Sequence, residues 1–517
     1  MMTRTLTRVA LLGGLSFAAP LLVLASGSYL EGATPVAEAP ARAESPALVR
    51  ALEAVQPDRI SADLHFLAAD DMGGRNTPSK ELEVAAQFLR ARLQRLEFQP
   101  GAGESYFFEY PLVSTALDPD ASTASWSSAD GNHELALASG YYISARSISE
   151  NSDVKGPLTS VGEGSKGELA DLDLSGSWAL LIDHEGRRTR SVARALQKIK
   201  KTGAIGVLII PGAEYSGKPL AERFGGEAYD RLVKGRVRFP RPEGKRSARR
   251  SMPVVYLDRA RGLELLAACT GHEDEADWFP AAGVETGVSF HEKRALKGDG
   301  GQVMVKDVCG FWPGSDPELS KEVILVSAHY DHVGTQDGVV YNGADDNGSG
   351  TSGVLAVAEA LKAYGPLKRS VLLIWVSGEE KGLWGSKAWA NNPQLPEGHR
   401  AVANLNIDMI GRNDPNQLFM TPSPAHKQFN IITETAMRLS PLEDFPELES
   451  ADDYYHRSDQ AEFARLDIPV AFLFAGIHED YHQPTDTADK IDFDKLSRVV
   501  RLVVRLLDEL QETPLAK

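Results

Sequence analysis

The stretch VSAHYDHVG, residues 326–334, places two histidines and an aspartate within four residues, directly after an apolar run. The whole chain has only 12 histidines, so this crowding asks for an explanation. Buried charge is unfavourable unless it is paired or bound to a metal ion. The segment is therefore either a solvated turn or one part of a site whose other groups come from elsewhere in the chain.

Further acids and histidines follow other apolar runs: GADDNGSG at 343–350, Gly378-Glu379-Glu380, Asp408, and Asp480-Tyr481-His482. Each group alone is more often surface than site, but their order and placement together indicate one centre. Imidazole and carboxylate without thiolate suit Zn²⁺. The groups outnumber what one ion needs, which favours a pair of metals sharing a carboxylate. Asp331 lies on the same face as His329, so we expect it to fix the tautomer of that histidine.

The elements that must position these groups alternate regularly after residue 302. Apolar, strand-like runs at 323–328, 371–377, 401–409 and 469–476 alternate with helical patterns at 351–365 and 493–512. This alternation predicts an α/β fold with a mixed, mainly parallel central sheet covered by helices on both faces. In such sheets ligands bind beyond the carboxyl ends of the strands, which is where the acids and histidines lie.

The first half of the chain has two regions with different sequence patterns. Residues 47–100 have helical periodicity, and 105–128 alternate like strands, FFEYPL being the clearest. From 130 to 297 a strand, helix, strand pattern predicts a smaller α/β unit, with SWALLID, RSVARALQKIKKTG and AIGVLII as its elements. We therefore predict a catalytic domain in two parts, 47–129 and 298–517, interrupted by an inserted domain at 130–297.

The N-terminus has the plan of an export signal. Arg4 and Arg8 precede an uncharged, apolar run at 9–25, and small residues follow. We predict a signal peptide at 1–27 and a flexible linker at 28–46, and hence a periplasmic or secreted protein. The uncharged stretch is just long enough to span a bilayer, so a retained membrane tether is the alternative.

Composition narrows the classes of function. The 517 residues are 42% hydrophobic and 25% charged, which is typical of a globular protein, and the net charge of −17 disfavours nucleic acid as a partner. A basic island at 231–250 is interpreted as a solvated loop. Cys269 and Cys309 are too few for a disulfide framework, and whether they form a single bridge stays open.

At these motifs the chain resembles the bacterial di-zinc aminopeptidases, the family twenty-eight metallopeptidases. Their clan also includes glutamate carboxypeptidase, the transferrin receptor and glutaminyl cyclase. The resemblance is carried, in the order of the chain, by AHYDHVG, NGADDNGSG, SGEEKGLWGS, NIDMIGR, HRSDQAEF and DYHQPTDT, and by DDMGGR at 70–75. The inserted unit resembles, more loosely, the protease-associated domain that many members carry. The resemblance implies a zinc exopeptidase that acts on peptides with a free N-terminus and holds two Zn²⁺.

The resemblance also implies a set of metal ligands. His329 and Asp408 are expected to bind one zinc, and Glu380 and His482 the other. Asp345 is expected to bridge the two ions.

Other residues receive catalytic or supporting roles by the same resemblance. Glu379 is expected to be the general base. Asp346 is expected to support the ligands without binding a metal itself, and to follow Asp345 across a cis peptide bond. Tyr481 matches a tyrosine that steadies the oxyanion in some members. Arg457, with its neighbour His456, matches a substrate-binding position.

Three rival functions stay open. A glutamate-type carboxypeptidase needs a cationic pocket, for which Arg412 and Arg457 are the only obvious candidates. A glutaminyl cyclase is disfavoured by the inserted unit, which such proteins usually lack. A metal-free binding protein is disfavoured because every ligand position and the base are present.

Overall fold

The computed structural model describes residues 44–143, 151–183, 189–211, 219–240, 252–270, 281–297 and 302–515. The predicted signal peptide and most of the predicted linker lie outside these residues. Among the described helices none is both long enough and apolar enough to cross a membrane. Cys269 and Cys309 are both free, which answers the question of a bridge between them.

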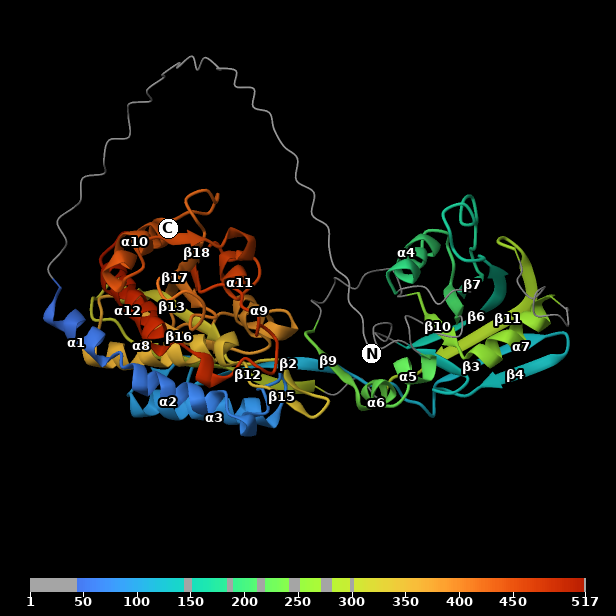
Figure 1. The fold of residues 1–517 in the computed structure, drawn as a ribbon, viewed down its shortest axis with the longest axis horizontal. Helices are drawn as coiled ribbons and strands as arrows, with labels where there is room; N and C mark the ends of the chain where they lie inside the picture. Colours follow the sequence, from blue (N-terminus) through green and yellow to red (C-terminus); the bar gives the residue numbers. More distant parts are fainter. Residues whose placement is uncertain are drawn as a thin grey trace, which may run out of the picture. The chain divides into compact units, whose positions relative to one another are not determined.

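The larger sheet is mixed, with four parallel strands at its centre (Figure 1). These are β20 (Val470–Phe474), β17 (Arg400–Ile407), β13 (Glu322–His329) and β16 (Ser370–Val376). On one side β18 (Leu418–Thr421) and β19 (Leu448–Ser450) complete the sheet, and on the other side β12 (Gln302–Trp312), β2 (Phe107–Thr115), β9 (Arg236–Arg238) and β1 (Gln99–Pro100). The predicted mainly parallel centre is confirmed, and the antiparallel strands lie at its edges.

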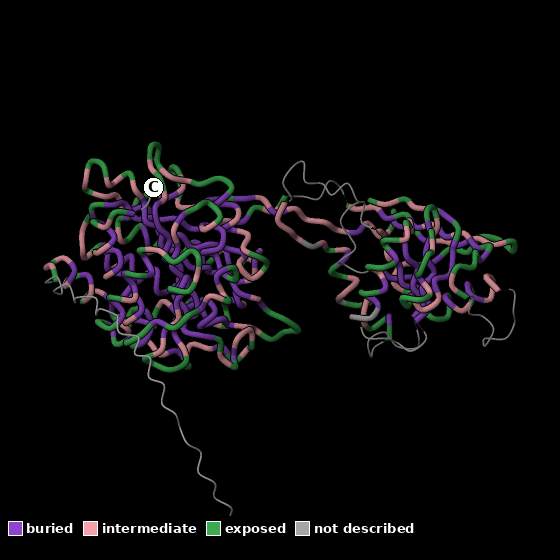
Figure 2. The backbone as a smooth tube through the Cα atoms, turned by 90° about the horizontal axis from the view of Figure 1, so that it is seen from above, coloured by how far each residue is buried: buried purple, intermediate pink, exposed green. Residues whose placement is uncertain are grey.

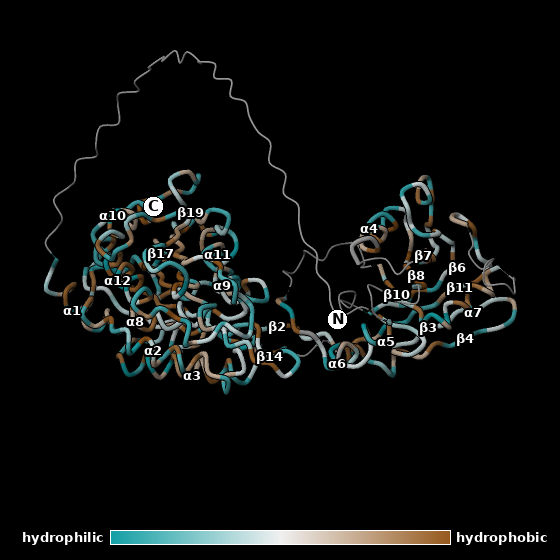
Figure 3. The backbone as a smooth tube through the Cα atoms, in the orientation of Figure 1, coloured by the Kyte–Doolittle hydropathy of each residue, from teal (hydrophilic) through white to brown (hydrophobic). Residues whose placement is uncertain are grey.

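Both faces of this sheet are covered, as the apolar strands predict. Ile324 and Val326 of β13 point to a core with α8 (Gly350–Tyr364) and α12 (Phe493–Leu510). Val323 and Leu325 point to the opposite core, with Trp389 of α9 (Trp384–Asn391). The first face is also covered by α1 (Pro46–Ala54), α2 (Pro57–Leu67) and α3 (Lys80–Arg95). Two further helices in this part of the chain are α10 (Ile431–Leu439) and α11 (Gln460–Ala464). Figure 2 shows that the interior of the chain is mostly buried, and Figure 3 shows hydrophobic segments in the interior.

The second sheet has eight strands in the order β4-β3-β11-β6-β7-β8-β10-β5. Their bounds are β3 Thr123–Ser128, β4 Gly131–Leu135, β5 Tyr141–Ile143, β6 Ser152–Ser160, β7 Trp178–Asp183, β8 Gly206–Pro211, β10 Val254–Leu257 and β11 Glu285–Arg294. Four helices accompany it: α4 (Thr189–Ile199), α5 (Leu220–Phe224), α6 (Glu227–Lys234) and α7 (Arg259–Thr270). Leu180 of β7 packs in a core with α7, whereas Leu181 packs against α4 on the other face.

The boundary between the two sheets differs from the predicted position. β3 precedes residue 130 and yet pairs with β11 in the second sheet. In the other direction, β9 lies within the predicted insertion but pairs with β2 of the larger sheet. The sequence of a short strand does not show which strand it pairs with, because pairing depends on packing between side chains of neighbouring strands. The other predicted boundaries stay predictions.

We predict that Leu373→Ala destabilises the larger sheet by about 2–5 kcal/mol, because Leu373 of β16 is fully buried and the cavity left behind cannot be refilled. Leu442→Ala is the control, since that side chain is 55% exposed and its loss should change stability by less than about 0.5 kcal/mol. Urea unfolding followed by tryptophan fluorescence measures both. Equal midpoints for the two variants would contradict this account of the core.

Candidate metal centre

The carboxyl ends of the four central strands deliver the candidate residues to one edge of the sheet. β13 ends at His329, β17 ends one residue before Asp408, and β16 is followed after two residues by Glu379 and Glu380. His482 lies on the loop after β20. Because these strands are parallel neighbours, their ends meet at the same edge.

The first group of ligands surrounds His329. Its Nε2 atom lies 3.3 Å from Asp408 Oδ1 and 3.4 Å from Asp346 Oδ1. Ser458 donates a hydrogen bond of 2.8 Å to the other oxygen of Asp408, so Oδ1 faces the histidine. All three candidate ligands are buried.

The second group surrounds Glu380. His482 Nε2 lies 3.0 Å from Glu380 Oε2 and 3.1 Å from Asp346 Oδ2. His332 Nδ1 lies 2.8 Å from Glu380 Oε1 on the opposite side. Asp346 therefore takes part in both groups, one oxygen toward each.

Asp345 was predicted to bridge the two groups, but the carboxylate that faces both of them is that of the next residue, Asp346. Asp345 points away from the histidines of both groups: Gly411 N donates to its Oδ1 at 2.7 Å, and His478 Nε2 lies 3.2 Å from its Oδ2. The cis peptide bond is Asp346–Asn347, not Asp345–Asp346. Only one of two adjacent side chains can face the centre. The carboxylate of Asp486 accepts hydrogen bonds from the main-chain N–H groups of both aspartates, and this fixes Asp346 as the one that does.

A buried arginine holds the same loop from behind. Arg75, the last residue of DDMGGR, donates hydrogen bonds of 2.8–2.9 Å to the main-chain oxygens of Tyr330, Asn342 and Gly343. Burial lowers the pKa of Arg75 to about 10, so it stays charged at neutral pH. This single side chain ties the end of β13 to the loop that carries Asp346.

The carboxylate of Asp331 holds the main chain of Glu379 rather than the imidazole of His329. Its carboxylate accepts hydrogen bonds from Glu379 N (3.1 Å) and from the Thr77 hydroxyl (3.0 Å). His329 Nδ1 lies 3.1 Å from the main-chain oxygen of Asp331 and 3.7 Å from its carboxylate. The main chain of Asp331 therefore orients the imidazole, which the sequence analysis assigned to its carboxylate.

The electrostatics of the centre favour a cation. Burial alone lowers the pKa of His329, but the carboxylates of Asp408, Asp331 and Asp346 outweigh burial and raise it well above its usual range. The pKa of His482 is likewise raised, to about 10, against the effect of burial, by Asp346 and Glu380. Histidines with such neighbours take up protons unless another cation replaces them.

The donor set fits zinc. Asp346 Oδ2, Asp408 Oδ1 and Glu380 Oε1 are buried, and among the described residues their near polar neighbours are imidazole nitrogens at 2.8–3.3 Å, with no well-aligned hydrogen bond. Buried carboxylate oxygens without such bonds are unfavourable, and coordination would satisfy them. Imidazole nitrogens and carboxylate oxygens at these separations match the ligands that zinc takes in hydrolases.

Glu379 adjoins the centre without joining either group. Burial raises its pKa well above the usual range, and the carboxylates of Asp459 and Asp408 add to the effect while His329 opposes it. A carboxyl group in such surroundings is suited to accept a proton and give it back.

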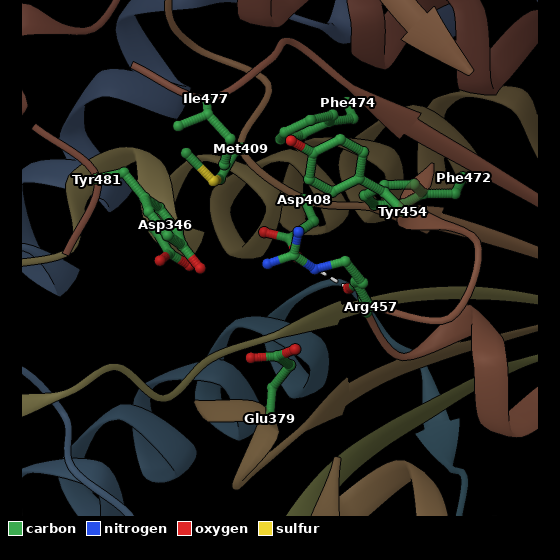
Figure 4. A pocket seen from close by; sticks show the side chains of 11 residues that line it. Asp346, Glu379, Asp408, Met409, Tyr454, Arg457, Phe472, Phe474, Ile477 and Tyr481 are labelled. Atoms are coloured by element: carbon green, nitrogen blue, oxygen red, sulfur yellow. Dashed lines mark hydrogen bonds between the residues drawn. The ribbon is translucent and has the colours of Figure 1, made fainter. Parts of the chain in front are cut away.

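One pocket opens onto these residues (Figure 4). Its polar wall contains Asp346, Glu379 and Asp408, and the Arg457 guanidinium points into it, 5.1 Å from the Tyr454 ring. The remaining lining is mostly apolar and aromatic: Met409, Phe472, Phe474, Ile477 and Tyr481, with Ser458. The space between these side chains is about 430 Å³, part of which is open solvent.

The remaining predicted residues differ in whether they line the pocket. Tyr481 lines the pocket and its ring stacks on His482 at 3.9 Å. His456 is exposed, packs against Tyr455 and is not among the residues that line the pocket, and its predicted substrate contact stays a prediction. His332 and His478 lie near the site motifs in the sequence, but no specific role is predicted for either. The only signal for His332 was its place in the same crowded segment as His329.

Comparisons with known proteins identify the fold. The fold is similar to that of the aminopeptidase from Aneurinibacillus sp. strain AM-1, with a TM-score of 0.50 and 20% identity over 91% of this chain and 97% of that one. It is equally similar to a zinc aminopeptidase from Bacillus subtilis, with a TM-score of 0.50 and 19% identity over 88% and 95% of the two chains. The fold is therefore that of zinc aminopeptidases. Residues 307–507 match the model of Peptidase family M28.

Curated relatives match a shorter region. The leupeptin-inactivating enzyme 1 of Streptomyces exfoliatus is 34% identical over 35% of this chain and 37% of its own length. A probable leucine aminopeptidase of Arthroderma otae is 31% identical over 38% and 56%, respectively. Aminopeptidase YwaD of Bacillus subtilis is 28% identical over 36% and 41%. The chain thus spans roughly two-fifths to just over half of the length of these relatives.

We predict that Asp346→Asn prevents tight binding of zinc by either group, because each group loses a shared anionic ligand. Asp345→Asn is the matched control: it removes the same charge one residue away and should leave two zinc ions bound. Isothermal titration of the metal-depleted protein measures both. Retention of two tight sites in Asp346→Asn, with their loss in Asp345→Asn, would show that Asp345 is the bridging ligand, as the sequence predicts.

Proposed function

We propose that the protein is an exported di-zinc aminopeptidase that removes residues from the N-terminus of peptides. The observation that carries the proposal is the shared carboxylate of Asp346, which faces two imidazole–carboxylate groups beside Glu379. The match of residues 307–507 to Peptidase family M28 and the relatives that are named aminopeptidases support it.

The proposed ligands follow the two groups. His329 and Asp408 hold one ion, Glu380 and His482 hold the other, and Asp346 bridges them. Two bound zinc ions would supply a polarised carbonyl and a water molecule of lowered pKa.

The protein's own groups then move protons. Glu379 accepts the proton of the attacking water and delivers it to the nitrogen of the leaving amine. Asp331 holds the main chain of Glu379, so the carboxylate keeps its place beside the substrate carbonyl. Burial raises the pKa of Tyr481 far above its usual range, and nearby acids add to this, so its hydroxyl stays protonated and can donate to the oxyanion.

The pocket indicates where the N-terminal residue lies. The carboxylates of Asp408 and Glu380 attract the α-ammonium group. The apolar wall of Met409, Phe472 and Phe474 receives the side chain, which favours leucine, methionine or phenylalanine over charged residues.

The carboxypeptidase alternative is weaker for a structural reason. Of its two candidate arginines, Arg412 donates to Asp480 at 2.9 Å and does not line the pocket. Arg457 is the remaining candidate, and it shares the pocket with three carboxylates. A substrate carboxylate would therefore have Arg457 as its single cationic side chain among the described residues of the pocket.

Export and the inserted domain belong to the same proposal. The basic start and apolar run of residues 1–27 support export. The eight-stranded sheet, with strands and helices near the predicted positions, supports a domain of the protease-associated type.

We predict that Glu379→Ala lowers kcat for an unblocked peptide by about 100- to 10,000-fold, because the proton acceptor is lost. Zinc content should stay at two ions per chain, since Glu379 belongs to neither group. Glu318→Gln, a change at a largely exposed carboxylate, is the control and should keep full activity. Turnover near that of the wild type in Glu379→Ala would show that another group is the base.

We predict that Ile477→Asp shifts specificity toward N-terminal lysine and arginine. Ile477 lines the pocket and is 44% exposed, so a carboxylate fits there without disturbing the core. The ratio of kcat/KM for lysyl over leucyl substrates should rise by roughly tenfold, equivalent to ~1.4 kcal/mol. Ile431→Asp, a change at an exposed isoleucine outside the pocket, should leave the ratio unchanged. An unchanged ratio in Ile477→Asp would mean that the side chain binds elsewhere.

A further inference from the structure

The main-chain N–H groups of Gly378 and Glu379 are held by side chains from two distant segments. Gly378 N donates to the Thr77 hydroxyl at 3.1 Å, and Glu379 N donates to Asp331 Oδ1, also at 3.1 Å. The Thr77 hydroxyl in turn donates to the other oxygen of Asp331 at 3.0 Å. Thr77 and Asp331 therefore form one unit, which holds Glu379 together with the residue before it. The function proposed above gives Thr77 no role.

The turn after β16 needs these bonds because it leaves the sheet sharply. Gly378 has φ of +72°, a backbone conformation that favours glycine, and a Cβ atom there would lie 2.9 Å from Cβ of Trp384. The next residues form η6 (Glu379–Lys381), a single helical turn. The first N–H groups of a helical turn find their partners outside it. Thr77 and Asp331 supply those partners.

Thr77 is itself fixed, because its segment is bonded to the chain that follows β13. His332 N donates to the main-chain oxygen of Arg75 at 3.2 Å, and Gly334 N donates to that of Gly74 at 3.0 Å. The side chain of Thr77 is only 1% exposed. An N–H group donates and a carboxylate oxygen accepts, so the hydroxyl between them has one orientation that makes both bonds. This contact is therefore specific in direction as well as in distance.

We propose that Thr77 is a positioning residue for Glu379. This inference rests on the proposed function and adds to it a residue outside the region that matches Peptidase family M28. Without the hydroxyl, Gly378 N and Asp331 Oδ2 each lose a buried partner, and the turn must shift to regain one. Such a shift moves the carboxylate of Glu379 away from the attacking water. Proton transfer requires hydrogen-bond distance, so the rate falls while substrate binding is unchanged.

The first experiment separates the hydroxyl of Thr77 from its methyl group in the zinc-loaded enzyme. Thr77→Val keeps the shape of the side chain and removes the hydroxyl. It should lower kcat for an unblocked peptide by about 10- to 100-fold, with KM and the zinc content of the wild type. Thr77→Ser keeps the hydroxyl and should retain kcat within about threefold. Thr335→Val is the matched control, because that exposed threonine donates to the main-chain oxygen of Gly73 and touches neither residue of the turn.

A second experiment asks whether Thr77 acts through Glu379. In the Glu379→Ala background the proposed base is absent, so adding Thr77→Val should change the remaining rate by less than about twofold. A double-mutant cycle compares this effect with the effect of Thr77→Val in the wild-type background. A purely structural role for Thr77 would give the same loss of rate in both backgrounds.

Each outcome decides the proposal. Loss of kcat in Thr77→Val, recovery in Thr77→Ser and no further loss in the Glu379→Ala background support it. Wild-type kcat in Thr77→Val, or equal loss in both backgrounds, overturns it while the aminopeptidase function stands. If Thr77→Val does not fold, Thr77→Ala replaces it, and a kcat equal to that of Thr77→Ser overturns the proposal. A wild-type protein that binds zinc and cleaves no unblocked peptide overturns the proposed function, and this role of Thr77 with it.

Discussion

The concentration of negative charge at the ends of the central strands is the constraint on which the site depends. Asp346, Glu379, Glu380 and Asp408 meet in one small region, and other acids lie directly behind them. Such a cluster is stable only with compensating positive charge. Here the charge comes from Arg75 behind the loop and from histidines whose pKa values are raised by the acids. Zinc ions would replace those protons, so the features that are unfavourable without metal are those that would bind it.

The surrounding chain keeps this charge in a fixed pattern. Arg75 donates to four main-chain carbonyls, those of Leu67, Tyr330, Asn342 and Gly343. Asp486 fixes the direction of Asp345 and Asp346, and Asp331 holds the main chain of Glu379. These contacts join segments that are far apart in sequence. As a result, the part of the chain before residue 100 contributes directly to a centre whose proposed ligands all lie after residue 328. A change in Arg75 would therefore be felt at the metal positions although it touches none of the proposed ligands.

Much of the fold could be predicted from the sequence, because buried parallel strands are continuous apolar runs and their carboxyl ends gather ligands. The strands around 323–328 and 371–377 and the helix at 351–365 lie within one or two residues of the prediction. What failed depends on contacts between distant residues. The choice between Asp345 and Asp346 is fixed by Gly411 and Asp486, which no local pattern shows. The partners of β3 and β9, and the pairing of Arg412 with Asp480, are likewise properties of the folded chain.

The central claim is that the pocket binds a free N-terminus. The most direct measurement incubates the zinc-loaded protein with an unblocked peptide and with its N-acetylated twin, and follows both by mass spectrometry. The account predicts stepwise loss of residues from the N-terminus of the unblocked peptide and no cleavage of its twin. Removal of residues from the C-terminus of both peptides would contradict the account and make the protein a carboxypeptidase.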